Sequence, residues 1–143
     1  MHPSAGACGR RLHLPLLTGA AGLLDCLAVG IGGFLGTVLR YGIGLLPQPA
    51  GSVFPLKTLC INVLGAFVLG AVAASAARNR SLDPRLVLML RVGVCGGFTT
   101  FSTFAYESAG LLQSGHTAAA AAYVLASLLL GVLAVFAAQL LFG

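Results

Sequence analysis

The stretch VCGGFTTFSTFAYE, residues 94–107, differs from the other long segments of the chain, which are almost wholly aliphatic. Glycines lead into a run in which hydroxyl side chains are interspersed with phenylalanines, and a glutamate follows. Neither a soluble core strand nor a lipid-facing helix needs this mixture. If the segment crosses a membrane, clustered glycines ahead of hydroxyl residues predict a helix break, which is tolerated at that depth only within protein or beside a polar cavity.

The composition identifies an integral membrane protein. Of the 143 residues, 58% are hydrophobic and 8% are charged, whereas a soluble domain carries about 25% charged residues. The net charge is +5, but the basic residues are scattered between apolar segments and are not interleaved with aromatics as on a nucleic-acid-binding surface. We therefore expect no nucleic-acid partner.

Four segments are apolar and long enough to cross a bilayer, which takes about 20 residues. They cover residues 24–46, 56–77, 86–112 and 117–142. The connections between them are short, so helices that are consecutive in the chain should run antiparallel. The sequence predicts an all-α integral membrane domain over residues 24–143, with a break in the third of four transmembrane helices.

Residues 1–23 are predicted to form a flexible N-terminal arm. The pair Arg10-Arg11 followed by apolar residues imitates a signal peptide, including the twin-arginine type. However, Asp25 does not fit a lipoprotein signal ending at Cys26, and no good small-residue cleavage site follows. We expect an uncleaved arm, and a misplaced start codon is the alternative.

The four cysteines form no C-x-x-C pair; they are Cys8, Cys26, Cys60 and Cys95. Cys60 and Cys95 lie within apolar segments, where a thiol packs as a small hydrophobic group. We expect neither a disulfide framework nor a cysteine metal site, and the redox compartment stays open.

Basic residues are unevenly distributed between the two sides of a four-span arrangement. One side has Arg10, Arg11, Arg78, Arg80 and Arg85, and the other has Arg40 and Lys57. Because positive residues favour the cytoplasmic side, this distribution places both termini in the cytoplasm. Without the arm the two sides are nearly balanced, and the distribution then hardly fixes an orientation.

One face of the first span has small residues and an arginine. Gly32, Gly36, Arg40 and Gly44 recur at every fourth position, and small residues at this spacing let another helix approach closely. Arg40 on this face should point toward protein or water. It is either an arginine that snorkels to the interface or a charge that draws anions into a vestibule.

The other spans contain further candidates. The amide of Asn62 can donate to an anion or join two helices. Phe101 and Phe104 share a helix face, and their electropositive ring edges can line a path for a small anion, although this spacing also occurs in ordinary packing. Glu107 is ionisable within a membrane segment and is therefore a functional candidate.

The fourth span has a face that is polar at one end and apolar at the other. It comprises Tyr123, Ser127, Gly131 and Val135. Hydroxyl groups on such a face can continue a polar path for only part of the helix.

These features together resemble the fluoride-specific ion channel family, Fluc or CrcB. The resemblance covers approximately residues 27–142 in order and spacing. It rests on GGFLGTVLRY at residues 32–41, NVLG at residues 62–65 and above all GGFTTFSTF at residues 96–104, followed by Glu107.

The resemblance implies an antiparallel, dual-topology dimer in which two subunits form two fluoride pores and hold one structural sodium ion. The sodium ligands would be the backbone carbonyls of Gly96 and Thr99 at the helix break. Glu107 would be an accessory residue. The fluoride pathway would include Arg40, Asn62, Phe101, Ser102, Thr103, Phe104, Tyr123 and Ser127.

The resemblance also implies a passive channel in the cell membrane, not an enzyme, that exports fluoride from the cytoplasm and relieves its toxicity. Fluoride enters acidified cells as neutral HF and is trapped there as the anion. Because Gly131 and Val135 lack hydroxyls, the polar path on the fourth span should be short. A homodimer is favoured, and a heterodimer with an oppositely oriented paralogue is the alternative.

Two other functions remain open. A small dual-topology multidrug or cation transporter also has four spans, but it uses a first-span carboxylate and aromatic residues that include Trp. Here the first span has only Asp25 at its edge, and Trp is absent. A non-conducting structural membrane subunit would not require the cluster at residues 99–104 beside Asn62.

Overall fold

The structure, a computed structural model, describes residues 20–48 and 51–143. Over these residues the chain is all-helical. Four stretches are long and apolar enough to cross a membrane: Ala20–Gly44 (α1), Leu56–Arg78 (α2), Pro84–Gln113, and Thr117–Phe142 (α6). The chain is therefore a multi-pass membrane protein, as its composition predicted.

The predicted ends of the spans need small changes. The first helix begins at Ala20 rather than at residue 24, and it ends at Gly44 because Leu45 and Leu46 enter the turn before Pro47. The other three spans agree with the prediction to within about two residues. Most of the predicted arm, with Cys8, Arg10 and Arg11, lies outside the described residues.

The third span is built from four consecutive pieces. They are Pro84–Leu88 (α3), the π-helical Met89–Cys95 (η1), Gly96–Phe98 (α4) and Phe101–Gln113 (α5). Its start is well specified by the sequence, because the Asp83 carboxylate accepts hydrogen bonds from the backbone N–H groups of Arg85 and Leu86. The π-helical piece was not predicted.

The predicted break is confirmed, but threonines form it and not the glycines. Thr99 (φ −77°, ψ 157°) and Thr100 (φ −148°, ψ 112°) are extended, whereas Gly96 and Gly97 are helical. The Thr100 hydroxyl accepts a hydrogen bond from Thr103 N at 3.2 Å and so caps α5. Threonine both favours extended backbone and supplies this cap.

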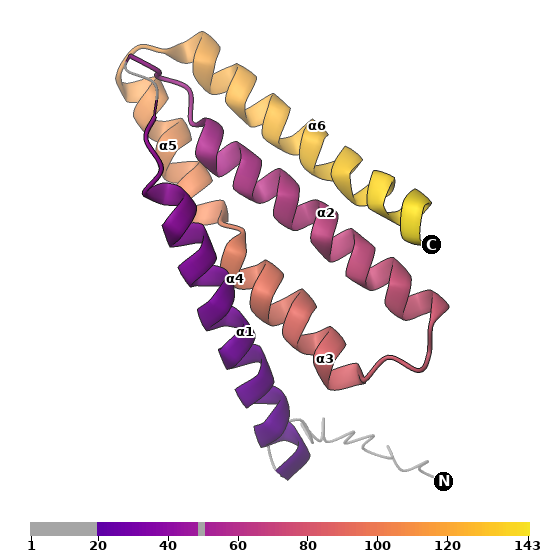
Figure 1. The fold of residues 1–143 in the computed structure, drawn as a ribbon. Coiled ribbons are helices and arrows are strands. Elements are labelled where there is room, and N and C mark those ends of the chain that lie inside the picture. The colour runs from indigo at the N-terminus through magenta and orange to yellow at the C-terminus, as the bar shows by residue number, and fades with distance from the viewer. Residues whose placement is uncertain (1–19, 49–50) are drawn as a thin grey trace, which may run out of the picture.

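Figure 1 shows the four spans running alternately up and down, so consecutive helices are antiparallel as predicted. The closest packing, however, is between helices that run in the same direction. The helix α1 lies along η1 and α4, and α2 lies along α6. Beyond the break, α5 leans toward the start of α6.

Glycines allow the close approach of α1 to the third span. Gly32 and Gly36 are both buried. A methyl group added to Gly32 would meet Met89 and Gly93, and one added to Gly36 would overlap the carbonyl of Val94. The small-residue face predicted for the first span is therefore a packing surface.

We predict that Gly36→Ala destabilises the protein, because the new methyl group overlaps backbone that cannot rotate away. Overpacking of this kind costs about 1–3 kcal/mol, which should lower the midpoint of thermal unfolding in detergent, followed by circular dichroism, by several degrees. Gly42→Ala is the matched control, since a methyl group at Gly42 meets no atom within 4 Å. Equal midpoints for the two variants would contradict the packing described here.

Candidate functional site

Asn62 holds the break in the third span by pairing with both backbone groups of Thr100. Its Nδ2 donates to the Thr100 carbonyl at 3.1 Å, and its Oδ1 accepts from Thr100 N at 2.8 Å. A helix break leaves such groups without intrahelical partners, and water is scarce at this depth. Asn62 therefore joins α2 to the break, which is one of the two roles considered for it, and its second amide N–H is not used by this pair.

Arg40 reaches the same region from α1. Its Nε donates to the Gly97 carbonyl at 3.1 Å, and the Thr37 hydroxyl donates to the same oxygen at 3.4 Å. The arginine is only partly buried. It points at the helix break and not along α1 toward the membrane surface, so simple snorkelling does not describe it.

Glu107 accepts hydrogen bonds from two hydroxyl groups on different helices. Thr58 on α2 donates to Oε1 at 2.8 Å, and Tyr123 on α6 donates to Oε2 at 2.7 Å. Tyr123 is completely buried. The carboxylate thus ties three helices together at one end of the bundle, and both of its oxygens have a donor.

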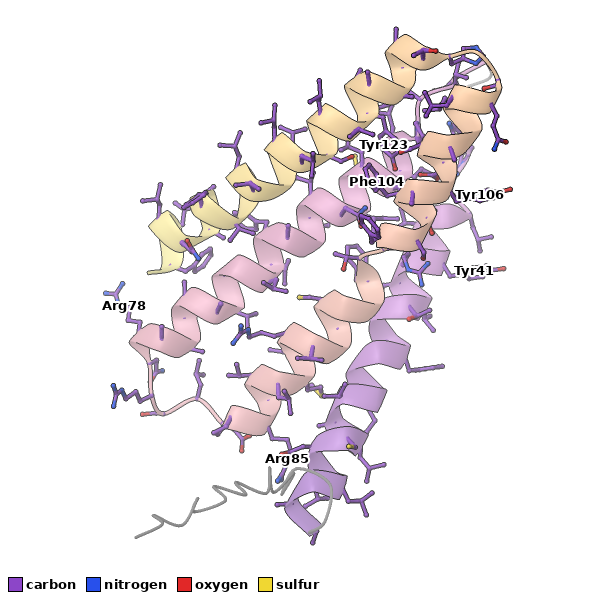
Figure 2. All side chains as sticks on the ribbon, turned by 180° about the vertical axis from the view of Figure 1, so that it is seen from behind. Tyr41, Arg78, Arg85, Phe104, Tyr106 and Tyr123 are labelled. Atoms are coloured by element: carbon purple, nitrogen blue, oxygen red, sulfur yellow. The ribbon has the colours of Figure 1, made fainter. Side chains whose placement is uncertain are left out.

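Phe104 packs inside this polar cluster, whereas Phe101 does not. The Phe104 ring lies 5.2 Å from the Tyr123 ring and 5.7 Å from the Phe101 ring, measured between centroids. Figure 2 shows Phe104 and Tyr123 together between the helices, with Tyr106 pointing away. Phe101 is 80% exposed and Phe104 is partly buried, so only one ring of the predicted pair packs among the described helices.

The remaining predicted hydroxyl groups are divided between the surface and the interior. Thr103 Oγ1 receives a hydrogen bond from the Thr100 hydroxyl at 2.9 Å, and Ser102 is exposed beside it. On α6, the Ser127 Oγ is buried and has no hydrogen-bond partner among the described residues. A buried hydroxyl without a partner is unusual.

A cavity of about 400 Å³ opens beside the break, and we call it the Arg40 cavity. Its polar lining consists of Arg40, Tyr41, Gln48, Lys57, Thr58, Thr100, Thr103 and Glu107. Two cationic side chains and several hydroxyls face one carboxylate whose oxygens are already hydrogen-bonded. The arrangement suits a small anion better than a cation.

The cavity brings together some of the predicted residues and adds others. Arg40, Thr103 and Glu107 line it, whereas the other pathway candidates lie outside its lining. Thr58 and Lys57 were missed as site residues. Thr58 had a detectable signal, because it precedes Asn62 by one helical turn and so lies on the same face of α2.

The break also leaves two backbone carbonyls available. Near the break, the carbonyls of Gly97 and Thr100 accept hydrogen bonds from side chains of other described helices. The carbonyls of Gly96 and Thr99 accept none. Gly96 is exposed on the surface of the helix bundle. No cluster of three or more His, Cys, Asp or Glu side chains that could hold a metal occurs among residues 20–48 and 51–143.

Comparison with known proteins agrees with this architecture. The sequence profile of the family described as "CrcB-like protein, Camphor Resistance (CrcB)" matches residues 27–139. The chain belongs to the CrcB family. The matched range contains every predicted site residue, both middle spans, and all but the first residues of α1 and the last residues of α6.

Relatives within the CrcB family align over most of their length. A protein of Chlorobaculum tepidum is 43% identical over 82% of this chain and 93% of its own. Proteins of Rhizobium meliloti and Thermus thermophilus are 46% and 44% identical, over 78% and 77% of this chain and 90% and 88% of their own. All three are named "Fluoride-specific ion channel FluC".

We predict that Asn62→Ala loosens the helix break. Without the amide, the N–H and C=O groups of Thr100 lose their partners, and each unsatisfied group costs about 1–3 kcal/mol. Hydrogen–deuterium exchange followed by mass spectrometry should show faster exchange in the peptide that contains Thr100.

The matched control is Asn79→Ala, which removes an amide whose Oδ1 accepts from Ser81 N in the exposed connection after α2. This variant should leave exchange at Thr100 unchanged. Unaltered protection of Thr100 in Asn62→Ala would mean that the break holds its shape without the amide.

Proposed function

We propose that this chain is the subunit of a fluoride-selective passive ion channel that exports fluoride from the cytoplasm and so relieves fluoride toxicity. The observation that carries the proposal is the Arg40 cavity at the break of the third helix, in a chain of the CrcB family whose relatives are named for fluoride conduction. The protein is an ion channel and not an enzyme. In a bacterium, its four spans place it in the plasma membrane.

The electrostatics of the cavity favour the entrance of an anion. Arg40 and Lys57 are both positive, and each is oriented by a hydrogen bond to a carbonyl, of Gly97 and Gly44 respectively. The start of α5 adds a helix N-terminus, where N–H groups and the helix dipole attract negative charge. Arg40 and Lys57 outnumber Glu107, the one carboxylate in the lining, and an excess of positive charge in a cavity raises the local concentration of anions.

Conduction also requires that the ion leave. The proposed path beyond the cavity is lined by hydroxyls, by the amide of Asn62 and by ring edges. All of these bind an anion more weakly than a fixed positive charge would. Thr103 lines the cavity, Phe104 is the next residue on α5, and Tyr123 and Ser127 lie on α6. The unpartnered Ser127 hydroxyl supports this assignment, because a passing anion would give it an acceptor.

We propose that a second copy, inserted antiparallel, completes the pore. Phe101 and Tyr106 are 80% and 82% exposed, and Phe101 lies at the break, where the path must run. A ring that lines a pore must be enclosed on its other side by protein. A homodimer is the simpler assembly, and a heterodimer with an oppositely oriented paralogue remains the alternative.

We further propose that the dimer holds one structural sodium ion between the two breaks. The carbonyl oxygens of Gly96 and Thr99 are hard ligands. The hydrogen bonds between the described helices end on Gly97 and Thr100 instead, so these two oxygens are not used by them. Gly96 is exposed and has no side chain to obstruct a second copy. Carbonyl ligation needs no carboxylate, so the residues present fit a monovalent cation.

The ion pair of Asp25 argues against the alternative of a cation or multidrug transporter. This first-span carboxylate forms an ion pair with Arg85 at 2.8 Å, at the end of the bundle away from the Arg40 cavity. It is therefore not a free carboxylate aimed into a binding site. Glu107 is likewise engaged by two hydroxyl donors.

We predict that liposomes containing the purified protein release fluoride but not chloride. Vesicles loaded with potassium fluoride are diluted into fluoride-free buffer with valinomycin, and release is followed with a fluoride electrode. Protein-free vesicles give the leak rate. Equal release of chloride, or no fluoride release by a correctly assembled protein, would rule out the proposed function.

We predict that removal of sodium weakens the dimer. In N-methyl-D-glucamine chloride, the sodium is replaced by a cation too large for a carbonyl site. Protein purified in this salt should show a larger monomer fraction than protein purified in sodium chloride, measured by light scattering after size-exclusion chromatography. It should also show lower fluoride flux, because the breaks would no longer be held together. The same dimer fraction and flux in both salts would leave the sodium site without support.

A further inference from the structure

Arg91 is a charged side chain inside the third span that the proposed pathway does not use. It lies in the π-helical segment Met89–Cys95 and is exposed. Among residues 20–48 and 51–143 it has no hydrogen-bond or ion-pair partner. The other basic side chains of the described helices each have one: Arg40 with Gly97, Lys57 with Gly44, Arg78 with Gly143 and Arg85 with Asp25.

The neighbours of Arg91 show which way it faces. Gly93 packs against α1, and Val87 and Leu90 line a groove with residues of α2. Arg91 and Val92 line a second hollow whose other lining residues, Pro84, Val87 and Leu88, also belong to the third span. Both side chains are exposed, as is Gly96. Gly96 follows Arg91 by five residues, which is the hydrogen-bond spacing of a π-helix, so the two residues lie on neighbouring parts of one face.

A lone arginine at this depth is unfavourable against lipid, so its side chain should face protein or water. The face it shares with Gly96 is the one that a second copy covers in the proposed dimer. Arg91 precedes the break, whereas Thr103 and Glu107 of the Arg40 cavity follow it. Reversing the second copy therefore brings its Arg40 cavity to the side of the membrane on which Arg91 of the first copy lies.

We propose that Arg91 supplies positive charge to the anion entrance of the opposite subunit, so that each entrance is served by residues of both copies. This inference rests on the proposed channel function and on the antiparallel dimer. Arg91 attracts fluoride toward the Arg40 cavity without binding it tightly, because its charge acts across water. It raises the rate at which dilute fluoride enters and has little influence once the pore is saturated.

The experiment compares fluoride efflux of Arg91→Gln, Arg91→Lys and the unchanged protein over a range of fluoride concentrations at low ionic strength. Loss of one charge near the ion path should lower flux at low fluoride about three- to tenfold. The deficit should shrink at high fluoride or high salt, and Arg91→Lys should conduct nearly as well as the unchanged protein.

Arg85→Gln is the matched control, because it removes the same charge from the same span but at a residue already paired with Asp25. It should leave the concentration dependence unchanged. Normal flux in a dimeric Arg91→Gln protein would overturn the inference. If no neutral variant at this position assembles, Arg91 is required for folding or assembly and the inference is equally overturned.

Two further measurements distinguish the proposed role of Arg91 from lipid anchoring and from failure of the proposed channel function. Repeating the measurement in vesicles of neutral phosphatidylcholine and in vesicles containing phosphatidylglycerol tests whether Arg91 is a lipid-headgroup anchor. A deficit confined to the anionic vesicles would overturn the inference, and a deficit in both supports it. Absence of fluoride flux in the unchanged protein would instead refute the proposed function itself.

Discussion

The architecture of this protein depends on the pairing between Asn62 and the backbone of Thr100. A helix interrupted within a membrane exposes N–H and C=O groups that lipid cannot satisfy. Here one amide side chain from α2 satisfies both groups of Thr100, and the Thr100 hydroxyl then caps the helix that follows. The break is consequently a rigid feature with a defined direction on each side.

The other polar contacts are arranged around this break. Arg40 and Thr37 attach α1 to the Gly97 carbonyl just before it. Beyond it, α5 carries Glu107 to the hydroxyls of Thr58 and Tyr123. These contacts engage all four spans, so the Arg40 cavity lies where the helices are fixed relative to one another. Side chains held in this way can present charge to an ion without reorganising when it arrives.

The sequence was a good guide to the elements and a partial guide to the site. Hydropathy located the spans because a bilayer sets their length, and the motif at residues 96–104 identified the segment that breaks. The resemblance placed the break at Gly96 and Thr99, and nothing in the sequence showed that Gly96 stays helical while Thr99 and Thr100 are extended. Nor did it reveal Thr58, whose role depends on a carboxylate 49 positions away.

By itself, the sequence determined that this is a four-span membrane protein of the CrcB family with an interrupted third helix, because apolar length and a specific motif are local properties of the chain. Only the tertiary structure decided which helices pack in parallel, which oxygen each polar group meets, and that Phe104 is partly buried against Tyr123 while Phe101 is exposed. Those outcomes depend on how closely glycine-bearing faces approach and on where a buried donor finds an acceptor. Both are relations between residues far apart in sequence.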